Sequence, residues 1–286
     1  IFLWDGDILL AYGLVGLVCW RLIRDAPGNR SLFNTGVILY LTGIGVLLLL
    51  GFISGDAPNR SWIPDAANLQ YEQWWKLNGG TEAISNRIDL LSSNLVALGA
   101  QYGWQLAGMM LIGASLMRSG WLRGEFSLHH YRRIGVWLIV VGLLINIPAI
   151  YAQWHLGWMY RWCAFLLQAP RELSAPFQTI GYAALAFGYW PQLSRLRLVN
   201  AIAHVGRMAL SNYLLQTVIC TTFFFRMGWF MKFDRLSLLA IVPFVWVINI
   251  LFSMLWLRYF RQGPVEWLWR QLTARAAGVS LKHPAR

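Results

Sequence analysis

The chain has 286 residues, of which 57% are hydrophobic and 13% are charged, and its formal net charge is +12. Ordinary soluble domains carry about 25% charged residues, so a soluble fold of this size could not bury so much apolar surface. The basic residues lie in short gaps beside apolar runs and form no stripe on a polar face. This pattern argues against nucleic acid as a partner and favours anionic lipid head groups.

Seven apolar runs follow one another along the chain, and each has roughly the 17 to 25 residues that an α-helix needs to cross a bilayer. The sequence therefore predicts an all-α, polytopic membrane helix bundle that forms a single membrane domain over residues 1–286. The predicted spans are residues 5–22, 32–53, 95–117, 134–154, 173–192, 207–227 and 236–257.

The gaps between these runs alternate in charge. One set of gaps, together with the tail, holds sixteen Lys and Arg residues and three acids. The other set holds eight Lys and Arg residues and nine acids. Because basic residues are enriched on the cytoplasmic side of inner-membrane proteins, we expect the basic tail, residues 258–286, in the cytoplasm. The long gap, residues 54–94, is then external, and its segments 66–77 and 82–91 each have the pattern of a short amphipathic helix.

The chain begins at Ile1 rather than at a methionine, and it runs at once into an apolar segment that resembles no signal peptide. We therefore expect further membrane spans upstream of this sequence. The three cysteines stand alone, with neither a CxxC motif nor the spacing of zinc ligands, so the sequence predicts no disulfide and no metal site.

Two carboxylates, Asp5 and Asp7, flank a glycine at the edge of the first apolar run. Carboxylates are costly to desolvate at the edge of hydrocarbon, so they must face water, a cation or a polar cavity. One interpretation is a functional polar site. The other is a solvated helix N-terminus, in which Asp7 is the capping residue.

Asn212 and Gln216 lie four residues apart in the sixth run, so both amides should project from the same face of a helix. They either hydrogen-bond to neighbouring helices or line a polar substrate cavity. Arg207, at the inner end of this run, could bind an anionic ligand or extend to lipid phosphate. His204 lies beside Arg207 and is either a surface histidine or an acid–base group.

Three stretches of the chain carry a resemblance to a known family: residues 4–9 (WDGDIL), 206–216 (GRMALSNYLLQ) and 263–270 (GPVEWLWR). They resemble the YeiB-type membrane proteins, the domain-of-unknown-function 418 family, and the likeness extends over essentially the whole chain. The family is distantly similar to transmembrane acyltransferases that move acyl groups onto sugars and glycans. In those relatives a histidine on a membrane span is the acid–base group, and the resemblance implies that its counterpart lies upstream of Ile1.

The leading hypothesis is a bacterial inner-membrane acyltransferase. Acyl-CoA would enter from the cytoplasm as a co-substrate, no cofactor would be tightly bound, and the acceptor would be a hydroxyl or amine group of a small molecule or glycan. The alternatives are a transporter or exporter of a small polar solute, or a non-catalytic membrane scaffold. Association with further copies of the chain stays open.

Acyl transfer requires a base to deprotonate the acceptor and hydrogen-bond donors to stabilise the oxyanion. Under the leading hypothesis, Asn212 with Tyr213 or Gln216 stabilises the oxyanion. Arg207, with His204 nearby, binds the phosphate of the donor. Asp5 or Asp7 orients the upstream base.

Overall fold

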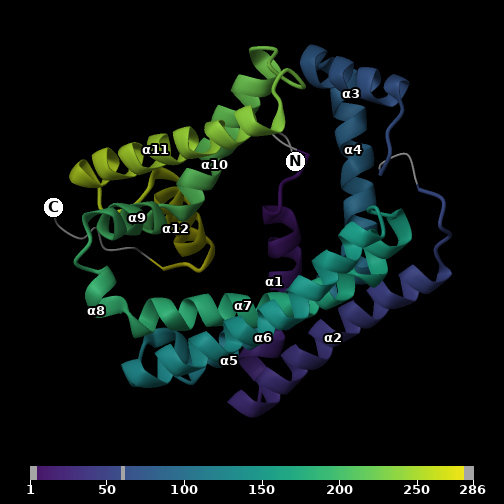
Figure 1. The fold of residues 1–286 in the computed structure, drawn as a ribbon. Coiled ribbons are helices and arrows are strands. Elements are labelled where there is room, and N and C mark those ends of the chain that lie inside the picture. The colour runs from purple at the N-terminus through teal and green to yellow at the C-terminus, as the bar shows by residue number, and fades with distance from the viewer. Residues whose placement is uncertain (1–4, 59–61, 280–286) are drawn as a thin grey trace. The chain divides into compact units, whose positions relative to one another are not determined.

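The computed structural model describes residues 5–58 and 62–279 (Figure 1). Every regular element in these ranges is a helix, so the predicted all-α class is confirmed. The chain divides into two compact units, and the described part of unit 1 comprises Asp5–Glu72 and Gly80–Trp190. The described part of unit 2 comprises residues 73–79 and 191–279.

Unit 1 is built from long helices joined by short turns. Its elements in chain order are α1 (Leu9–Asp25), α2 (Asn29–Ile53), the first half of α3 (Ala66–Asn78), α4 (Gly80–Ala97), the π-helix η1 (Leu98–Tyr102), α5 (Gly103–Arg118), the 3₁₀ turn η2 (Trp121–Arg123), α6 (Leu128–His155), the π-helix η3 (Trp162–Leu166) and α7 (Gln168–Gly188). The remaining elements, which lead into and form unit 2, are α8 (Trp190–Leu193), α9 (Arg197–Arg207), α10 (Ala209–Thr221), the π-helix η4 (Thr222–Arg226), α11 (Arg235–Tyr259) and α12 (Pro264–Ala276).

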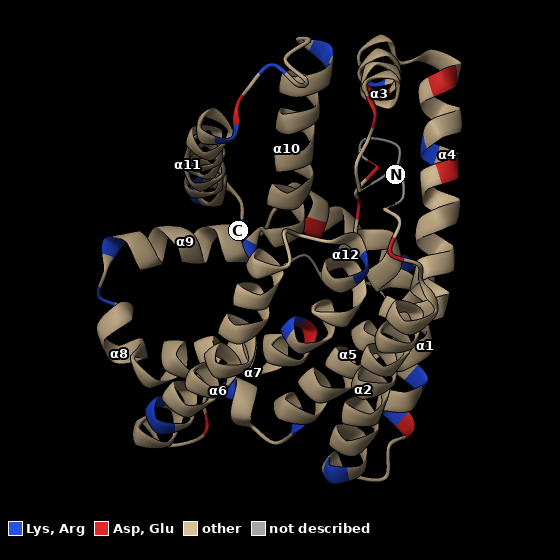
Figure 2. Cartoon of the chain, turned by 45° about the vertical axis from the view of Figure 1, so that its right-hand side comes forward, with Lys and Arg blue, Asp and Glu red and all other residues tan. Residues whose placement is uncertain are grey.

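Among the described residues, four helices are long and apolar enough to cross a membrane: Asn29–Ile53, Gly80–Arg118, Leu128–His155 and Arg235–Tyr259. A fifth span would be the pair Arg197–Arg207 and Ala209–Arg226, which is bent by 88°. In Figure 2 the body of α2 is free of charged residues, as a segment in hydrocarbon requires. The protein is therefore a polytopic helical membrane protein. The count of seven spans is not confirmed, because α1 has 17 residues and α7 is not apolar enough to qualify.

The segment predicted as a separate short helix over residues 82–91 is part of a longer one. The helix begins at Gly80 and runs for 39 residues to Arg118 through the π-helical turn η1. Gly79 and Gly80 both have positive φ angles, of 69° and 73°, and they separate α3 from α4. No proline follows before α5, so nothing in the chain ends the helix at residue 91. The other predicted helix of this gap, residues 66–77, is confirmed as α3.

Glycines allow the helices of unit 1 to pack closely. A Cβ atom on Gly108 in α5 would lie 2.6 Å from the carbonyl oxygen of Gly36 and 2.7 Å from the amide nitrogen of Tyr40, both in α2. Gly181 in α7 is similarly close to α6, because its Cβ would lie 2.8 Å from a side-chain carbon of Ile139. Small residues at such crossings are typical of membrane helices, since close backbone approach replaces the hydrophobic driving force that lipid removes.

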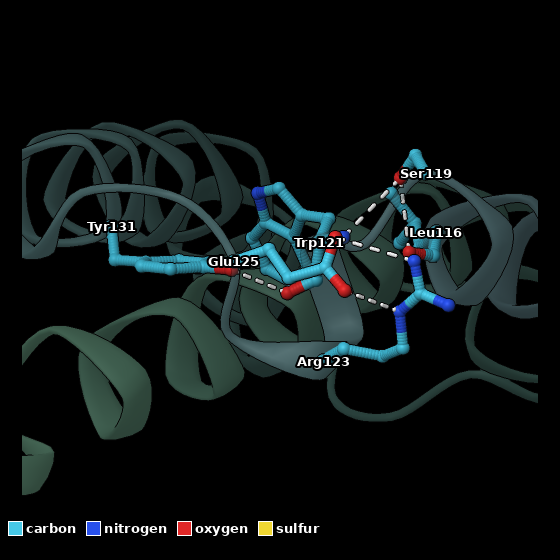
Figure 3. Close-up of polar contacts among 6 residues, drawn as sticks. All are labelled: Leu116, Ser119, Trp121, Arg123, Glu125 and Tyr131. Carbon is cyan, nitrogen blue, oxygen red and sulfur yellow. Dashed lines mark hydrogen bonds and ion pairs between the residues drawn. The ribbon is translucent and has the colours of Figure 1, made fainter.

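The connection between α5 and α6 is an ordered turn (Figure 3). Tyr131 is buried, and its hydroxyl donates a hydrogen bond of 2.5 Å to the carbonyl oxygen of Trp121. Gly120 has a φ angle of 82°, and the side chain of Glu125 occupies the space where its Cβ would stand. Glu125 forms an ion pair of 2.8 Å with Arg123. This basic turn is thus held by local hydrogen bonds and by one aromatic anchor.

Candidate functional site

A cavity of about 420 Å³ lies at the N-terminal end of α1 in unit 1. Its walls come from residues 5–12, from one face of α4 and from residues 98–106 around η1. Most of the wall is apolar, and a few polar side chains interrupt it. The polar and aromatic-hydroxyl members are Asp5, Asp7, Tyr12, Arg87, Asn94 and Tyr102.

The two predicted carboxylates enter this cavity from the segment before α1. Asp5 and Asp7 are both half-buried. Asp7 also accepts a hydrogen bond of 3.1 Å, through Oδ1, from the backbone amide of Leu9, the first residue of α1. The side chain therefore bonds to the first residue of α1 and lines the cavity, while the N-cap position itself is Ile8 rather than Asp7.

The opposite wall is one face of α4 and its continuation. Arg87, Leu91, Asn94 and Leu98 recur at helical spacing, which places them on a single face. The π-helical turn that follows includes Tyr102, whose hydroxyl donates to the carbonyl oxygen of Asn94 at 3.2 Å. π-helical turns often occur at functional sites, because they reorient the side chains of a helix.

Gly103 is the residue that permits this π-helical turn to join α5. A Cβ atom at this position would lie 2.3 Å from the carbonyl oxygen of Leu98, which is too close for any other residue. The sequence did not single out Arg87 and Asn94, which line the same cavity as the two aspartates. A signal was present, since their spacing of seven residues corresponds to about two helical turns. A half-apolar cavity with carboxylates and a guanidinium suits a small ligand that bears hydroxyl or amine groups.

The other predicted site residues belong to unit 2. Asn212 is 4% exposed, and its Nδ2 donates to the carbonyl oxygen of Val205 at 3.1 Å and to Oγ of Ser253 at 2.8 Å. Its Oδ1 has no hydrogen-bond partner among the described residues. An Asn side chain has two N–H hydrogens, so both are used within the helix packing. Asn212 thus points into unit 2, as expected, and its donors are engaged with the protein.

Gln216 does not share the environment of Asn212, although the two lie one turn apart on α10. Its side chain is exposed, and Tyr213 between them is half-buried. The expectation that both amides point into the bundle is therefore wrong for Gln216. Four residues advance an α-helix by one turn plus about 40°, and within the described structure no element covers this face of α10 at Gln216.

Arg207 is the last residue of α9 and is exposed. Its Nη2 donates a hydrogen bond of 2.9 Å to the carbonyl oxygen of Arg261, in the segment before α12. His204 is half-buried, and its Nδ1 lies 2.6 Å from the carbonyl oxygen of Asn200. The sequence placed Arg207 at the start of a spanning helix. The structure places it at the C-terminal end of α9, and α10 begins after the buried Met208.

The N-terminus of α10 is occupied by a carboxylate of the chain itself. Glu266 in α12 accepts hydrogen bonds from the backbone amides of Leu210, at 2.8 Å, and Ser211, at 3.0 Å, and from the hydroxyl of Ser211. Ser211 Oγ in turn accepts a hydrogen bond from the amide of Val265 at 3.1 Å. Burial acts to raise the pKa of Glu266, but these hydrogen bonds outweigh it, and the pKa is lowered.

This arrangement corrects the idea that the helix start beside Arg207 is open to a donor phosphate. The amides that would bind an anion already bind Glu266. The two stretches that form this pairing both carry the family resemblance, but no pattern in the sequence predicted that they meet. Asp5 and Asp7 belong to unit 1 and the other five predicted site residues to unit 2, so each unit holds its own polar region. Within residues 5–58 and 62–279, no three His, Cys, Asp or Glu side chains are arranged to hold a metal ion.

Comparison with known proteins identifies the family. The family model described as "Protein of unknown function (DUF418)" matches residues 116–276. The sequence is 71% identical over 283 residues to the uncharacterized protein YeiB of Escherichia coli (strain K12), an alignment that covers 99% of this chain and 74% of that relative. The chain belongs to the DUF418 family.

A second relative of this DUF418 chain is the uncharacterized protein YxaH of Bacillus subtilis (strain 168). It is 29% identical, over 95% of this chain and 67% of its own length. No solved structure matches the chain. The resemblance found in the sequence is therefore confirmed at the level of the family. The family model includes Ser211, Asn212 and Glu266, whereas Asp5, Asp7 and Arg87 precede the matched range.

Proposed function

We propose that this DUF418 protein is a membrane acyltransferase that moves an acyl group from acyl-CoA to a hydroxyl or amine of a small molecule or glycan. The observation that carries the proposal is the cavity lined by Asp5, Asp7 and Arg87. Apolar walls with a few convergent polar groups are the usual form of a site for small polar ligands. We assign the acceptor to this cavity and place the protein in the bacterial inner membrane, with the C-terminal tail in the cytoplasm.

In the proposed reaction, the oxygen or nitrogen of the acceptor attacks the thioester carbonyl carbon. A carbon–oxygen or carbon–nitrogen bond forms, the carbon–sulfur bond breaks, and the proton of the acceptor passes through a base to the CoA thiolate. Asp5 and Asp7 accept hydrogen bonds from the acceptor and from the base, and so hold both in line. Arg87 lines the same cavity and donates hydrogen bonds to the acceptor, whereas Asn212 cannot stabilise the oxyanion while both its N–H hydrogens bind Val205 and Ser253.

For the donor, we keep Arg207 as the phosphate-binding residue. It is exposed, and its hydrogen bond to the carbonyl oxygen of Arg261 leaves other guanidinium N–H groups to form the bidentate contact that phosphate favours. Arg195 and Arg197 add charge at the other end of α9. Arg207→Lys keeps the charge but loses the planar guanidinium that donates two parallel hydrogen bonds to phosphate. Binding of CoA to the full-length protein should therefore weaken markedly. Equal CoA binding by wild type, Arg207→Lys and Arg207→Ala would remove Arg207 from the donor site.

The decisive experiment uses the full-length protein in proteoliposomes with radiolabelled acyl-CoA, and it measures both CoA release and labelled product. We expect Asp5→Asn, Asp7→Asn and Arg87→Gln to reduce turnover by about 10² or more, a usual effect of losing an acid–base contact or of misplacing a bound reactant. The matched control is Asp89→Asn, an exposed carboxylate on α4 that does not line the cavity. The amide oxygen of Asn can accept the same hydrogen bond from the amide of Leu9, so Asp7→Asn should keep the start of α1.

If the wild-type protein releases no CoA from a panel of acyl donors, or if the cavity variants behave as Asp89→Asn does, the proposal is wrong. The second candidate is then a transporter of a small polar solute. The 88° bend between α9 and α10 favours that alternative, because discontinuous helices are typical of transporter binding sites. Uptake of labelled polar solutes into the same proteoliposomes, without CoA release, would support transport. A protein with neither activity would leave the scaffold hypothesis.

A further inference from the structure

Unit 2 contains an apolar groove of about 260 Å³ between α10 with η4 on one side and the first half of α11 on the other. Every lining side chain is apolar, counting the thiol of Cys220 as a small hydrophobic group. A polar solute would lose its hydration in this groove without gaining hydrogen bonds. The lining residues are Ile219, Cys220, Phe223, Phe224, Ala240, Ile241, Phe244 and Val245.

Both walls of the groove depart from regular α-helix. Phe223 and Phe224 belong to the π-helical turn η4. In α11, Pro243 lies in the chain between the lining residues Ile241 and Phe244 and has no N–H to donate to the helix. A proline inside a helix removes one backbone hydrogen bond and kinks the axis. Irregularities on both sides of the same groove indicate that its shape is built into the two helices.

An aromatic cluster adjoins the groove at the loop between η4 and α11. The ring of Phe223 stacks on Trp229, with centroids 6.1 Å apart, and on Phe233, at 5.7 Å. Lys232 places its Nζ 5.7 Å from the centroid of the Trp229 ring. Tryptophan beside lysine is typical of the level of the lipid head groups, where one end of the ring is apolar and the other is hydrated. The groove therefore leads from an interfacial cluster toward the apolar part of the helix pair.

The loop beside this cluster is locally basic. Arg226, Lys232 and Arg235 are all exposed, and the single acid between residues 226 and 235 is Asp234. The carboxylate of Asp234 caps α11 by accepting a hydrogen bond of 3.0 Å from the amide of Ser237. Hydrogen bonds from the side chain and then from the amide of Ser237 lower the pKa of Asp234. The alternation of charge along the chain favours the external side for this loop, where basic residues are scarce. The orientation bias thus gives no reason for three bases here, whereas a phosphate ligand does.

We infer that the groove binds one acyl chain of an anionic phospholipid from the surrounding bilayer, with the lipid phosphate held by Arg226, Lys232 and Arg235. The apolar lining accommodates the acyl chain, and the three bases favour a negatively charged head group. This lipid site does not depend on the proposed acyl transfer. A lipid held between two helices also fills a space that the protein itself leaves open.

The test uses a substitution that fills the groove with a larger side chain. Ala240→Phe places a ring among the lining residues, and Leu239→Phe puts the same ring on the neighbouring, exposed position of α11 as the matched control. The full-length protein is purified from membranes in mild detergent, and phosphatidylglycerol retained per protein is measured by native mass spectrometry. We expect Ala240→Phe to retain roughly tenfold less lipid, because one or two methylenes no longer buried correspond to about that factor. Equal retention by Ala240→Phe, Leu239→Phe and wild type would overturn the inference.

Two further measurements separate the chain from the head group and keep the test valid if Ala240→Phe fails to fold. In a Cys19→Ala/Cys163→Ala background, added phosphatidylglycerol should slow the reaction of Cys220 with N-ethylmaleimide, since Cys220 lines the groove. An unchanged rate contradicts occupancy. The combined Arg226→Gln, Lys232→Gln and Arg235→Gln variant should lose the preference for phosphatidylglycerol over phosphatidylcholine. If wild type shows no such preference, the assigned role of the three bases is wrong.

Discussion

Glu266 and Ser211 are 55 residues apart in the chain, yet the carboxylate of Glu266 accepts hydrogen bonds from both the amide and the hydroxyl of Ser211. A carboxylate at this position satisfies amides that the first turn of a helix leaves unpaired, and it lies at the positive end of the helix dipole. The contact joins α12 to α10 within unit 2. It also joins two of the three stretches on which the family resemblance rests.

We expect Glu266→Gln to lower the free energy of unfolding of the protein in detergent by about 1–3 kcal/mol. A hydrogen bond to a charged group is worth about that much, and the Gln amide would turn a donor toward the donors of α10. Thermal unfolding followed by circular dichroism gives the measurement. Glu125→Gln is the matched control, because this exposed ion pair with Arg123 should contribute only about 0–1 kcal/mol. Equal losses in both variants would show that the Glu266 contact is not specific.

The same contact predicts a pH dependence. The pKa of Glu266 is lowered in the folded protein, so the folded state favours the carboxylate more than the unfolded state does. The stabilisation is therefore complete above the unfolded pKa of about 4.3 and is lost as the pH falls through the lower, folded value. The difference in melting temperature between wild type and Glu266→Gln should be constant near neutral pH and shrink in acid. A difference that grows as the pH falls would contradict this assignment.

Gly263 is required by space rather than by its backbone angles. Its φ of −66° is open to any residue, but a Cβ atom would lie 2.1 Å from Oε2 of Glu266 and 2.6 Å from Oγ of Ser211. We expect Gly263→Ala to displace the carboxylate and to cost about as much as Glu266→Gln, roughly 1–3 kcal/mol. Gly206→Ala in α9 is the control, since its Cβ would meet nothing within 4 Å. The double variant Gly263→Ala/Glu266→Gln should lose less than the sum of the single losses.

Close packing of α2 on α5 predicts a second pair of glycine variants. Gly108→Ala would press a methyl group against the backbone of Gly36 and Tyr40 and should destabilise the protein by about 1–3 kcal/mol. Gly113→Ala, on the same helix, meets nothing within 4 Å and should be neutral or slightly stabilising, because alanine favours helix. Thermal unfolding of both variants in one detergent decides between them. Equal stability would show that the two helices separate easily.

The charge bias predicts the orientation of the chain. In a background without Cys19, Cys163 and Cys220, a membrane-impermeant maleimide added to intact cells should label Ser85→Cys. It should label Ala277→Cys only after the membrane is made permeable. Both positions are exposed in the structure. Labelling of Ala277→Cys in intact cells, with Ser85→Cys protected, would reverse the proposed topology.

The sequence predicted those features that depend on residues close to one another along the chain. The length and apolarity of a run decide whether a helix can lie in hydrocarbon, so the helical membrane class could be inferred before any contact was known. Predicted helix boundaries were less accurate. Residues 80–97 carry enough polar side chains to read as part of an external loop, yet no breaker separates them from α5, and the helix continues.

Only the tertiary structure decided which polar groups meet, because such contacts join residues that no local pattern relates. The sequence by itself determined the apolar helices, the alternation of charge and the family, since these are properties of composition and spacing. The structure showed that Glu266 fills the anion site at the start of α10, and that Arg87 faces the same cavity as Asp5 and Asp7. It also separated Asn212 from Gln216, because burial depends on which helix covers each turn.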